Sequence, residues 1–344
     1  MQRMKILIIT QKVDRADAVL GFVHRWIEMF ATQFEQITVI CLERGESSLP
    51  DNVRVFSLGK EQGATRSAYI RRFFKIIWEE RRQYRSVFIH MNEEYLLLAG
   101  WLWKLLGKKV VMWRNHPAGS WRTHVAAFLC DRVLCTSEHS YTARFRKTKL
   151  MPVGIDTDYF MPSASVLRPE NSVLYVGRIA PVKKVDVLLG ALLLLREQGI
   201  AVTADIIGPS VAEDLAYRKA LQDRAARVLA LRVRDAIPYV AIREEYLTHQ
   251  VFVNLSPDGM YDKVIFEAMA SGALVLVSNT QLIRDLGEEV AVDAHDATRL
   301  AAKLGALLVL AAEERAARAA RYREYVVQKH SLRLLVRMVQ EELC

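Results

Sequence analysis

Two cationic side chains follow an apolar, strand-like run at residues 173–176 in the stretch VLYVGRIAPVKK. Gly177 ends the run and allows backbone to approach a ligand closely. A helix is expected from about Val185, so Arg178 and Lys183 would lie at its N-terminus, where backbone N–H groups attract anions. Arg offers a planar pair of donors and Lys a point charge. This spacing predicts a phosphate or diphosphate site. The alternative is a solvated loop with incidental basic residues.

A single carboxylate interrupts an apolar stretch in DGMYDKVIFEAMASG, residues 258–272. An unpaired buried carboxylate would be costly, so Glu267 needs a partner. A capping box does not explain it, because the residue three positions after Asp262 is Ile265 rather than Glu or Gln. Helical side chains lean toward the N-terminus, so Glu267 can reach a ligand there. It would repel phosphate, and we therefore expect it to bind hydroxyls, as on a ribose. The alternative is a core glutamate paired with Lys or Arg.

These residues must be positioned by the secondary structure around them. The expected strands are 6–10, 37–41, 87–90, 110–113, 132–135, 173–176, 202–207, 251–255 and 273–277. The expected helices include 21–34, 68–84, 95–106, 185–198, 212–230, 263–270 and 298–330. Such alternation predicts an α/β protein with parallel sheets covered on both faces. In these sheets, ligands bind beyond the carboxyl ends of the strands.

The length of 344 residues favours two domains. The chain turns polar and proline-containing between about 155 and 170, before a fresh strand begins at Val173. We therefore predict two domains, 1–155 and 156–330. A C-terminal helix at about 331–344 exceeds what the second domain needs and can pack back on the first.

Positive charge is concentrated in the front half of the chain. Residues 1–150 contain 25 Lys and Arg against 14 Asp and Glu, or +11, whereas the whole chain carries +9. One domain is therefore expected to meet an anionic partner such as nucleic acid, phospholipid or a phosphorylated substrate. The alternative is a solubilising surface.

Cysteine content and hydropathy indicate the cellular compartment in which the protein is expected. The four cysteines have no metal-site spacing, which predicts reduced thiols and a cytoplasmic protein. The N-terminal apolar run is too short for a signal peptide, and no uncharged apolar run approaches the ~18 residues of a membrane span.

Two stretches, GRIAPVKKVDVLL and SPDGMYDKVIFEAMASGALVLVS, together resemble the family 4 glycosyltransferases with GT-B architecture. The linker MPVGIDTDYF is similar to a turn of that family, and the resemblance is strongest from about 150 to 290. It implies two Rossmann-like domains whose parallel sheets face each other across a cleft. The first would bind an acceptor and the second a nucleotide-diphosphate sugar. It further implies a retaining transferase of hexosyltransferase type, acting on a glycan or lipid-linked acceptor, with no cofactor and no metal required.

The resemblance assigns roles to individual residues. Arg178 and Lys183 match the pair that neutralises the donor diphosphate, and Glu267 matches the residue that holds the ribose hydroxyls. His116 in MWRNHP matches a histidine placed near the transferred sugar, and a structural histidine is the alternative. Val240 matches the position that contacts the nucleobase.

Further residues are expected to line the two substrates. The segment expected at the sugar and distal phosphate comprises Gly259, Met260, Tyr261, Asp262 and Lys263, while Gly177 lies beside the diphosphate. The residues expected on the acceptor side are Gly21, Asp14, Asp17 and His24, all close to the end of the first strand.

One position departs from the family pattern. The family has a glutamate eight positions before Glu267, where this chain has Gly259. Asp258 or Asp262 could supply a carboxylate from the same loop. The sequence Asp-Thr-Asp at 156–158 mimics a metal-binding motif of another glycosyltransferase fold, but it lies in the interdomain linker, and we predict no metal site there.

The segments 66–85 and 101–109 combine tryptophans and other apolar residues with Lys and Arg. They could rest on an anionic membrane surface, or could be core-facing helices with a basic outer side. The first interpretation suits a cytoplasmic enzyme bound peripherally at the inner face of the membrane, in cell-envelope polysaccharide or glycolipid biosynthesis.

Three other functions fit part of the pattern. A GT-B epimerase or phosphorylase would use similar ligands, and a non-catalytic sugar-nucleotide-binding protein is compatible with Gly259. Nucleic-acid binding would explain the basic half. We predict no nucleic acid partner, because the basic residues form no reading motif and lie in the half without the phosphate site.

Overall fold

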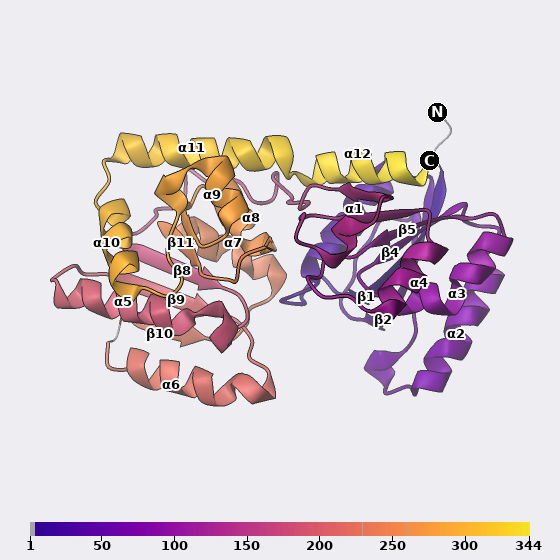
Figure 1. Ribbon diagram of the computed structural model, residues 1–344, viewed down its shortest axis with the longest axis horizontal. Coiled ribbons are helices and arrows are strands. Elements are labelled where there is room, and N and C mark those ends of the chain that lie inside the picture. Colours follow the sequence, from indigo (N-terminus) through magenta and orange to yellow (C-terminus); the bar gives the residue numbers. More distant parts are fainter. Residues whose placement is uncertain (1–3, 229, 260) are drawn as a thin grey trace. The chain divides into compact units, whose positions relative to one another are not determined.

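The computed structural model describes residues 4–228, 230–259 and 261–344, which form two compact units (Figure 1). The first unit comprises the chain up to residue 154 together with 238–240 and 332–344. The second comprises 155–237 and 241–331. The C-terminal segment 332–344 is therefore part of the first unit.

The first unit is built on a seven-stranded parallel sheet. Its strands are β1 (Lys5–Val13), β2 (Gln36–Arg44), β3 (Val53–Ser57), β4 (Ser86–His90), β5 (Lys109–Trp113), β6 (Arg132–Cys135) and β7 (Thr148–Leu150), in the order β3-β2-β1-β4-β5-β6-β7. Its helices are α1 (Gly21–Gln33), α2 (Arg66–Glu79), α3 (Glu94–Leu105), α4 (Trp121–Leu129) and α12 (Leu332–Leu343).

The sheet of the first unit is apolar on both faces, as the sequence of its strands requires. Successive side chains of a strand point to opposite faces, so Ile6 and Ile8 enter one core while Leu7 and Ile9 enter the other. Helices α1 and α12 cover the first core, and α2, α3 and α4 cover the second. This is why the strands read as continuous apolar runs.

The second unit contains a five-stranded parallel sheet. Its strands are β8 (Ser172–Val176), β9 (Thr203–Ile207), β10 (Leu231–Arg234), β11 (Val251–Asn254) and β12 (Leu274–Val277), in the order β10-β9-β8-β11-β12. Its helices are α5 (Val185–Glu197), α6 (Leu215–Ala225), α7 (Tyr239–Thr248), α8 (Lys263–Ala270), α9 (Thr280–Leu286), α10 (Ala297–Leu308) and α11 (Ala312–Lys329). The first two residues of α7 belong to the first unit.

The predicted α/β fold with two parallel sheets is confirmed, with some corrections. The strands β3, β7 and β10 were not predicted, and the single helix expected over 298–330 is divided into α10 and α11. Short 3₁₀ turns occur at Lys60–Gln62, Tyr141–Arg144, Pro181–Lys183, Ala212–Asp214 and Glu288–Val290. No helix in the described parts of the chain is both long and apolar enough to cross a membrane.

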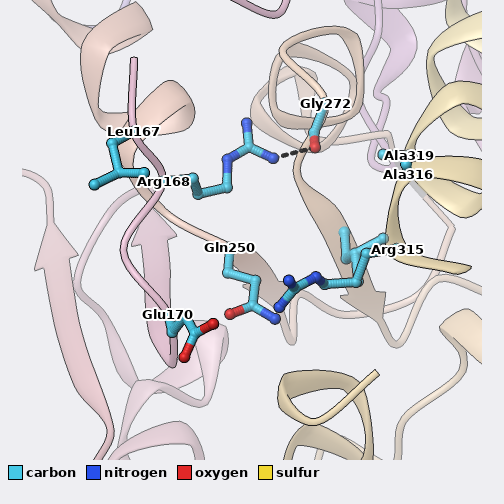
Figure 2. A pocket seen from close by; sticks show the side chains of 9 residues that line it. Leu167, Arg168, Glu170, Gln250, Gly272, Arg315, Ala316 and Ala319 are labelled. Atoms are coloured by element: carbon cyan, nitrogen blue, oxygen red, sulfur yellow. Dashed lines mark hydrogen bonds between the residues drawn. The ribbon is translucent and has the colours of Figure 1, made fainter. Parts of the chain in front are cut away.

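Helix α8 is held at its C-terminal end by the half-buried Arg168. The Arg168 guanidinium donates to the carbonyl oxygen of Gly272, just after α8 (Figure 2). It also donates to the carbonyl oxygen of Ser271 at 2.9 Å. The carbonyl oxygens of Leu247 (3.1 Å) and Tyr246 (3.3 Å) in α7 accept from the same group. One side chain thus satisfies carbonyl groups that two helix ends leave without intrahelical partners.

We expect Arg168→Met to lower the free energy of unfolding by about 2–4 kcal/mol, because several carbonyls lose a charged donor at once. Urea denaturation measures this loss. Arg315→Met is the matched control: Arg315 lines the same cavity of about 360 Å³, and its side chain makes no hydrogen bond or ion pair with any residue that the structure describes. Equal losses in both variants would contradict the role of Arg168.

Candidate active site

The candidate site lies at the carboxyl edge of the second sheet. Strands β8 and β11 are neighbours, although they are not consecutive in the chain, so the strand order reverses between them. Loops that leave such a pair of strands diverge and open a crevice for ligands. Residues 177–184 leave β8, and residues 255–262 leave β11 and lead into α8.

Lys183 joins these two loops. Its ammonium lies 2.7 Å from Oδ2 of Asp262 and donates to Oγ of Ser256 at 2.9 Å. The same carboxylate oxygen accepts hydrogen bonds from Nδ2 of Asn254 (3.1 Å) and from the Ser256 hydroxyl. The structure therefore brings Lys183 to Asp262, the residue that immediately precedes α8. The sequence had placed Lys183 only at the start of α5.

The Asp262 carboxylate is ionised by its surroundings. Burial raises the pKa of this carboxyl, but the Lys183 ammonium and the hydrogen bonds from Ser256 and Asn254 lower it further than burial raises it, so the net shift is downward. Oδ2 receives all three of these contacts. Oδ1 accepts no hydrogen bond from the described residues, and the side chain is about one quarter exposed. A ligand can therefore reach one oxygen of this group.

Arg178 brings a second cation to the loop after β8. Its side chain is exposed and forms neither a hydrogen bond nor an ion pair within the described ranges. Its backbone is fixed, because the buried Tyr175 hydroxyl donates to the Arg178 carbonyl at 2.9 Å. Gly208 allows this loop to pass: a Cβ there would lie 1.8 Å from the carbonyl oxygen of Gly177. A fixed backbone and an exposed guanidinium suit recognition of an anion.

Glu267 lies one turn inside α8 and is only 2% exposed. Its Oε2 accepts a hydrogen bond from the hydroxyl of Tyr246 at 3.1 Å. Burial lowers the pKa of Lys263, the first residue of α8, to about 7, and the charge of Glu267 opposes that shift. Glu267 therefore has protein neighbours at the helix start, and its role toward ribose hydroxyls stays a prediction.

The backbone explains why residue 259 is glycine. Gly259 has φ of +107°, a conformation that side chains with a Cβ rarely adopt, so a glutamate there would be strained. The preceding Asp258 is engaged elsewhere: it accepts from Thr280 N (2.9 Å) and Thr280 Oγ1 (2.6 Å) at the start of α9. Of the two candidate carboxylates in this loop, Asp262 is the one that lies at Lys183.

The remaining donor-side predictions are placed as follows. The Tyr261 ring makes edge contacts with Phe266 at 5.2 Å and His330 at 5.8 Å. Val240 is 51% exposed, in a segment grouped with the first unit. Met260 lies outside the described residues. The contacts of Tyr261, Val240 and Met260 with a sugar or a nucleobase stay predictions.

The first unit contains His116, predicted near the transferred sugar, and Asp17, predicted on the acceptor side. His116 is exposed, and its Nδ1 lies 2.9 Å from the carbonyl oxygen and 3.0 Å from the backbone nitrogen of Ala118, so this atom contacts the Ala118 backbone in either tautomer. Asp17 pairs with Lys12 at 2.8 Å and accepts from Leu20 N at 2.7 Å, just before α1. Their roles toward an acceptor stay predictions.

The other acceptor-side residues also serve local structure. Asp14 accepts from Ala16 N at 3.0 Å, and Gly21 is the first residue of α1. His24 is 2% exposed, and its Nε2 accepts from Ser48 N at 3.2 Å. A buried imidazole with this partner has a structural role, whatever it does for an acceptor.

Three possible metal ligands meet away from this site. Oxygen or nitrogen atoms of Asp205, Glu245 and His249 lie within 4.8 Å of one another. However, the Asp205 carboxylate already accepts from Arg232 Nε at 2.9 Å and lies 3.2 Å from His249 Nε2, and Arg234 pairs with Glu245 at 2.8 Å. The ligand oxygens are thus occupied by cations, and the cluster stabilises the packing of β9, β10 and α7.

The Asp205 network should make stability depend on acid pH. Burial alone raises the pKa of Asp205, but hydrogen bonds from His249 and Arg232 lower it to about 2, below the ordinary 3.8. Because the folded value is the lower one, the stabilisation is present above about pH 4 and is lost as pH falls toward 2. We expect Asp205→Asn to lower the free energy of unfolding by about 2 kcal/mol at pH 7 and by roughly half as much at pH 3.

Urea denaturation at both pH values checks this expectation. The control is Asp235→Asn, because the Asp235 side chain is 96% exposed although it pairs with Arg218 at 2.7 Å. A loss at pH 3 as large as that at pH 7 would contradict the assignment.

Sequence reasoning missed Asn254, Ser256 and Tyr246. The first two could have been found, because polar residues at the carboxyl end of an apolar strand, here VFVNLS, are typical of a ligand-binding edge. Tyr246 carries no such signal, since its pairing with Glu267 depends on how α7 packs against α8.

Known proteins share both this fold and part of this sequence. Residues 170–309 match the family of glycosyl transferases group 1. A D-inositol 3-phosphate glycosyltransferase of Streptomyces scabiei (strain 87.22) is 28% identical over 185 residues, which cover 48% of this chain and 42% of that protein. The chain thus matches less than half the length of this relative.

Solved structures extend the likeness over nearly the whole chain. Anabaena HepE in complex with UDP and glucose superposes with a TM-score of 0.75 and 17% identity, over 99% of both chains. Sucrose-phosphate synthase from Thermosynechococcus elongatus gives 0.73 and 18%, over 97% of this chain and 98% of the other. At this identity the likeness shows the fold, and the predicted GT-B class is confirmed. Assignment to family 4 stays a prediction. Lys183, Asp262 and Glu267 all lie within the segment that matches the glycosyl transferases group 1 family.

Proposed function

We propose that this chain is a retaining glycosyltransferase, of hexosyltransferase type, that takes its sugar from a nucleotide-diphosphate donor. The observation that carries the proposal is the ion pair between Lys183 and Asp262 at 2.7 Å. Asp262 directly precedes α8, and Glu267 lies one turn inside that helix. The family of residues 170–309 and the fold shared with glycosyltransferase structures support it.

The donor diphosphate would bind between the loops after β8 and β11. Lys183 has three N–H donors, and two of them are used by Asp262 and Ser256, so one remains for a phosphoryl oxygen. Arg178 adds an exposed guanidinium, and α8 and α5 add the N–H groups of their first turns. Negative charge grows on the leaving diphosphate as the glycosidic bond breaks, and these fixed donors would stabilise it. No metal is required in this scheme.

Glu267 would complete the donor site by accepting hydrogen bonds from ribose hydroxyls. Tyr246 holds one of its oxygens, which orients the carboxylate along α8. His116 would lie near the transferred sugar, in the first unit, which would bind the acceptor. The fixed Nδ1 leaves Nε2 to face a ligand, since no residue in the described ranges bonds to it.

The acceptor would be a glycan or a lipid-linked molecule, used in the cytoplasm for cell-envelope polysaccharide or glycolipid synthesis. Support for a membrane surface comes from four large side chains of the first unit: Trp78, Trp101, Leu105 and Phe128 are 52%, 51%, 77% and 72% exposed. Basic residues of α2 and α3 would add about 1 kcal/mol each near anionic lipid. Co-sedimentation with phosphatidylglycerol vesicles, weakened by salt, tests this; no excess over phosphatidylcholine vesicles would contradict it.

Transfer itself is tested by incubating the protein with UDP, GDP and ADP sugars and a panel of glycan and lipid acceptors. We expect release of one nucleotide diphosphate that depends on acceptor, and a product with the anomeric configuration of the donor. An altered sugar without acceptor would instead indicate an epimerase, and phosphate-dependent cleavage a phosphorylase. Heat protection by nucleotide diphosphate without any turnover would indicate a non-catalytic binder.

A further inference from the structure

The first unit contains an apolar cavity of about 500 Å³ at the carboxyl edge of its sheet. Leu42 in β2 and Leu58 just after β3 contribute from the sheet. Ile70 and Phe73 of α2 and Leu98 of α3 contribute from the helices that cover this face (Figure 1). In open parallel sheets this edge is where ligands bind, so the cavity lies where a second substrate is expected.

The cavity wall is open to solvent rather than sealed as core. Ile70 is 42% exposed, and Tyr69 and Leu98 are half-buried. The hydroxyls of a sugar would find partners only at the polar part of the lining, and each one buried against the apolar part would cost about 1–3 kcal/mol. The polar residues of the lining are Arg66, Tyr69, Asn92, Glu94, Tyr95 and Arg122. A hydrocarbon chain would instead remove apolar surface from water on both sides. The lining therefore favours an aliphatic ligand over a bare sugar.

The same cavity has cations at its edge. Arg66, the first residue of α2, and Arg122, in the first turn of α4, both line it and are exposed. Neither guanidinium forms a hydrogen bond or ion pair with the residues for which coordinates are described; Arg122 lies only over the Trp121 ring, at 5.9 Å. Glu94 also lines the cavity, so the net charge of these three groups is positive. An acidic head group would pair with the two arginines.

We propose that this cavity binds the hydrocarbon chain of an anionic lipid whose acidic head group, such as a phosphate, is held by Arg66 and Arg122. The inference rests on the proposed function in one respect, namely that such a lipid is the acceptor or carries it. Binding itself requires no donor and no turnover.

The test is calorimetric titration of the full chain with octyl, decyl and dodecyl phosphate below their micelle concentrations. We expect one molecule per chain, with affinity rising roughly fourfold for each added methylene until the cavity is full. Inorganic phosphate should compete only weakly. The double variant Arg66→Gln with Arg122→Gln should bind decyl phosphate more weakly but should bind neutral decanol as well as the wild type does.

Two variants and a control locate the ligand. Ile70→Asp and the cavity-filling Ile70→Trp should each weaken binding of decyl phosphate at least tenfold. Because one change makes the cavity polar and the other fills it, the same result in both is hard to attribute to misfolding. Val125→Ala is the control: Val125 is an exposed apolar residue of α4, the helix that carries Arg122, and it does not line the cavity, so binding should change by less than twofold. Equal weakening by Val125→Ala, affinity independent of chain length, or full competition by inorganic phosphate would each overturn the proposal.

Binding of nucleotide diphosphate, measured on the same samples, separates this proposal from the proposed function. If decyl phosphate binds as expected while no nucleotide diphosphate binds, the lipid site stands and the glycosyltransferase assignment fails. If the nucleotide binds and decyl phosphate does not, the cavity has another role and the glycosyltransferase assignment stands.

Discussion

Replacing Lys183 with alanine is expected to lower kcat for sugar transfer by about 10²–10³-fold, or about 2.7–4 kcal/mol, the loss associated with one preorganised donor to a developing charge. The ammonium is held in place by Asp262 (2.7 Å) and Ser256 (2.9 Å) before any donor binds. It therefore needs little reorganisation as the diphosphate leaves. Steady-state kinetics with saturating donor measure the effect.

The matched control is Lys184→Ala. Lys184 is the next residue, carries the same charge, and its side chain has no hydrogen bond or ion pair in the described part of the protein. We expect its kcat to stay within about threefold of the wild type, since only screened surface charge is lost. Similar losses in the two variants would mean that charge in general, rather than the position of Lys183, supports turnover.

Loss of stability must be separated from loss of chemistry in this experiment. Lys183→Ala leaves the Asp262 carboxylate with Ser256 and Asn254 but without its cation, which should lower the melting temperature. Adding Asp262→Asn removes the uncompensated charge and should restore much of that stability. Turnover should stay low in the double variant. Recovery of turnover together with stability would contradict a catalytic role for Lys183.

Glu267→Gln is expected to weaken binding of the nucleotide diphosphate by about 10–100-fold, because a hydrogen bond to a charged group contributes about 1.5–3 kcal/mol. The side chain is almost completely buried in the second unit. Because Gln has nearly the shape of Glu, the change removes the charge and little volume. Calorimetric titration measures the dissociation constant. The variant should bind free diphosphate almost as well as the wild type does, because the ribose contact alone is lost.

Tyr246→Phe tests the alternative that Glu267 is only a core glutamate. It removes the hydroxyl that donates to Glu267 at 3.1 Å and keeps the ring. If Glu267 only stabilises the fold, both variants should lower the melting temperature and leave nucleotide affinity unchanged. If it holds the ribose, Glu267→Gln should affect affinity far more than Tyr246→Phe does.

The strands that sequence reasoning found and those it missed differ in their place in the sheets. Every predicted strand is present, and β3, β7 and β10 were missed; β3 and β7 are the two edges of the first sheet, and β10 is an edge of the second. Central strands are buried on both faces and read as apolar runs. The three missed edge strands are partly exposed, and VRVFS, TKL and LRVR carry charges that hide them. The fourth edge strand, β12, reads LVLV, is buried and was predicted.

The candidate site shows the same division between local and tertiary information. Arg178, Lys183 and Glu267 were predictable because a strand end, a glycine and a helix start place them by local rules. The choice between Asp258 and Asp262 was not predictable, because it depends on Thr280 drawing Asp258 to the start of α9. The left-handed backbone at Gly259 explains the missing glutamate and has no local signature beyond the glycine itself.

The role of Lys183 at the donor diphosphate is tested most directly by comparing the dissociation constants of a nucleoside diphosphate and of the corresponding monophosphate. A thermal-shift screen across UDP, GDP, ADP and CMP first selects the base, and calorimetric titration then gives both dissociation constants for the wild type, Lys183→Ala and Lys184→Ala. We predict that the wild type and Lys184→Ala prefer the diphosphate by roughly tenfold or more, the worth of about one added charged hydrogen bond, and that Lys183→Ala loses this preference. An undiminished preference in Lys183→Ala, or no binding of any of these nucleotides to the wild type, would contradict the account.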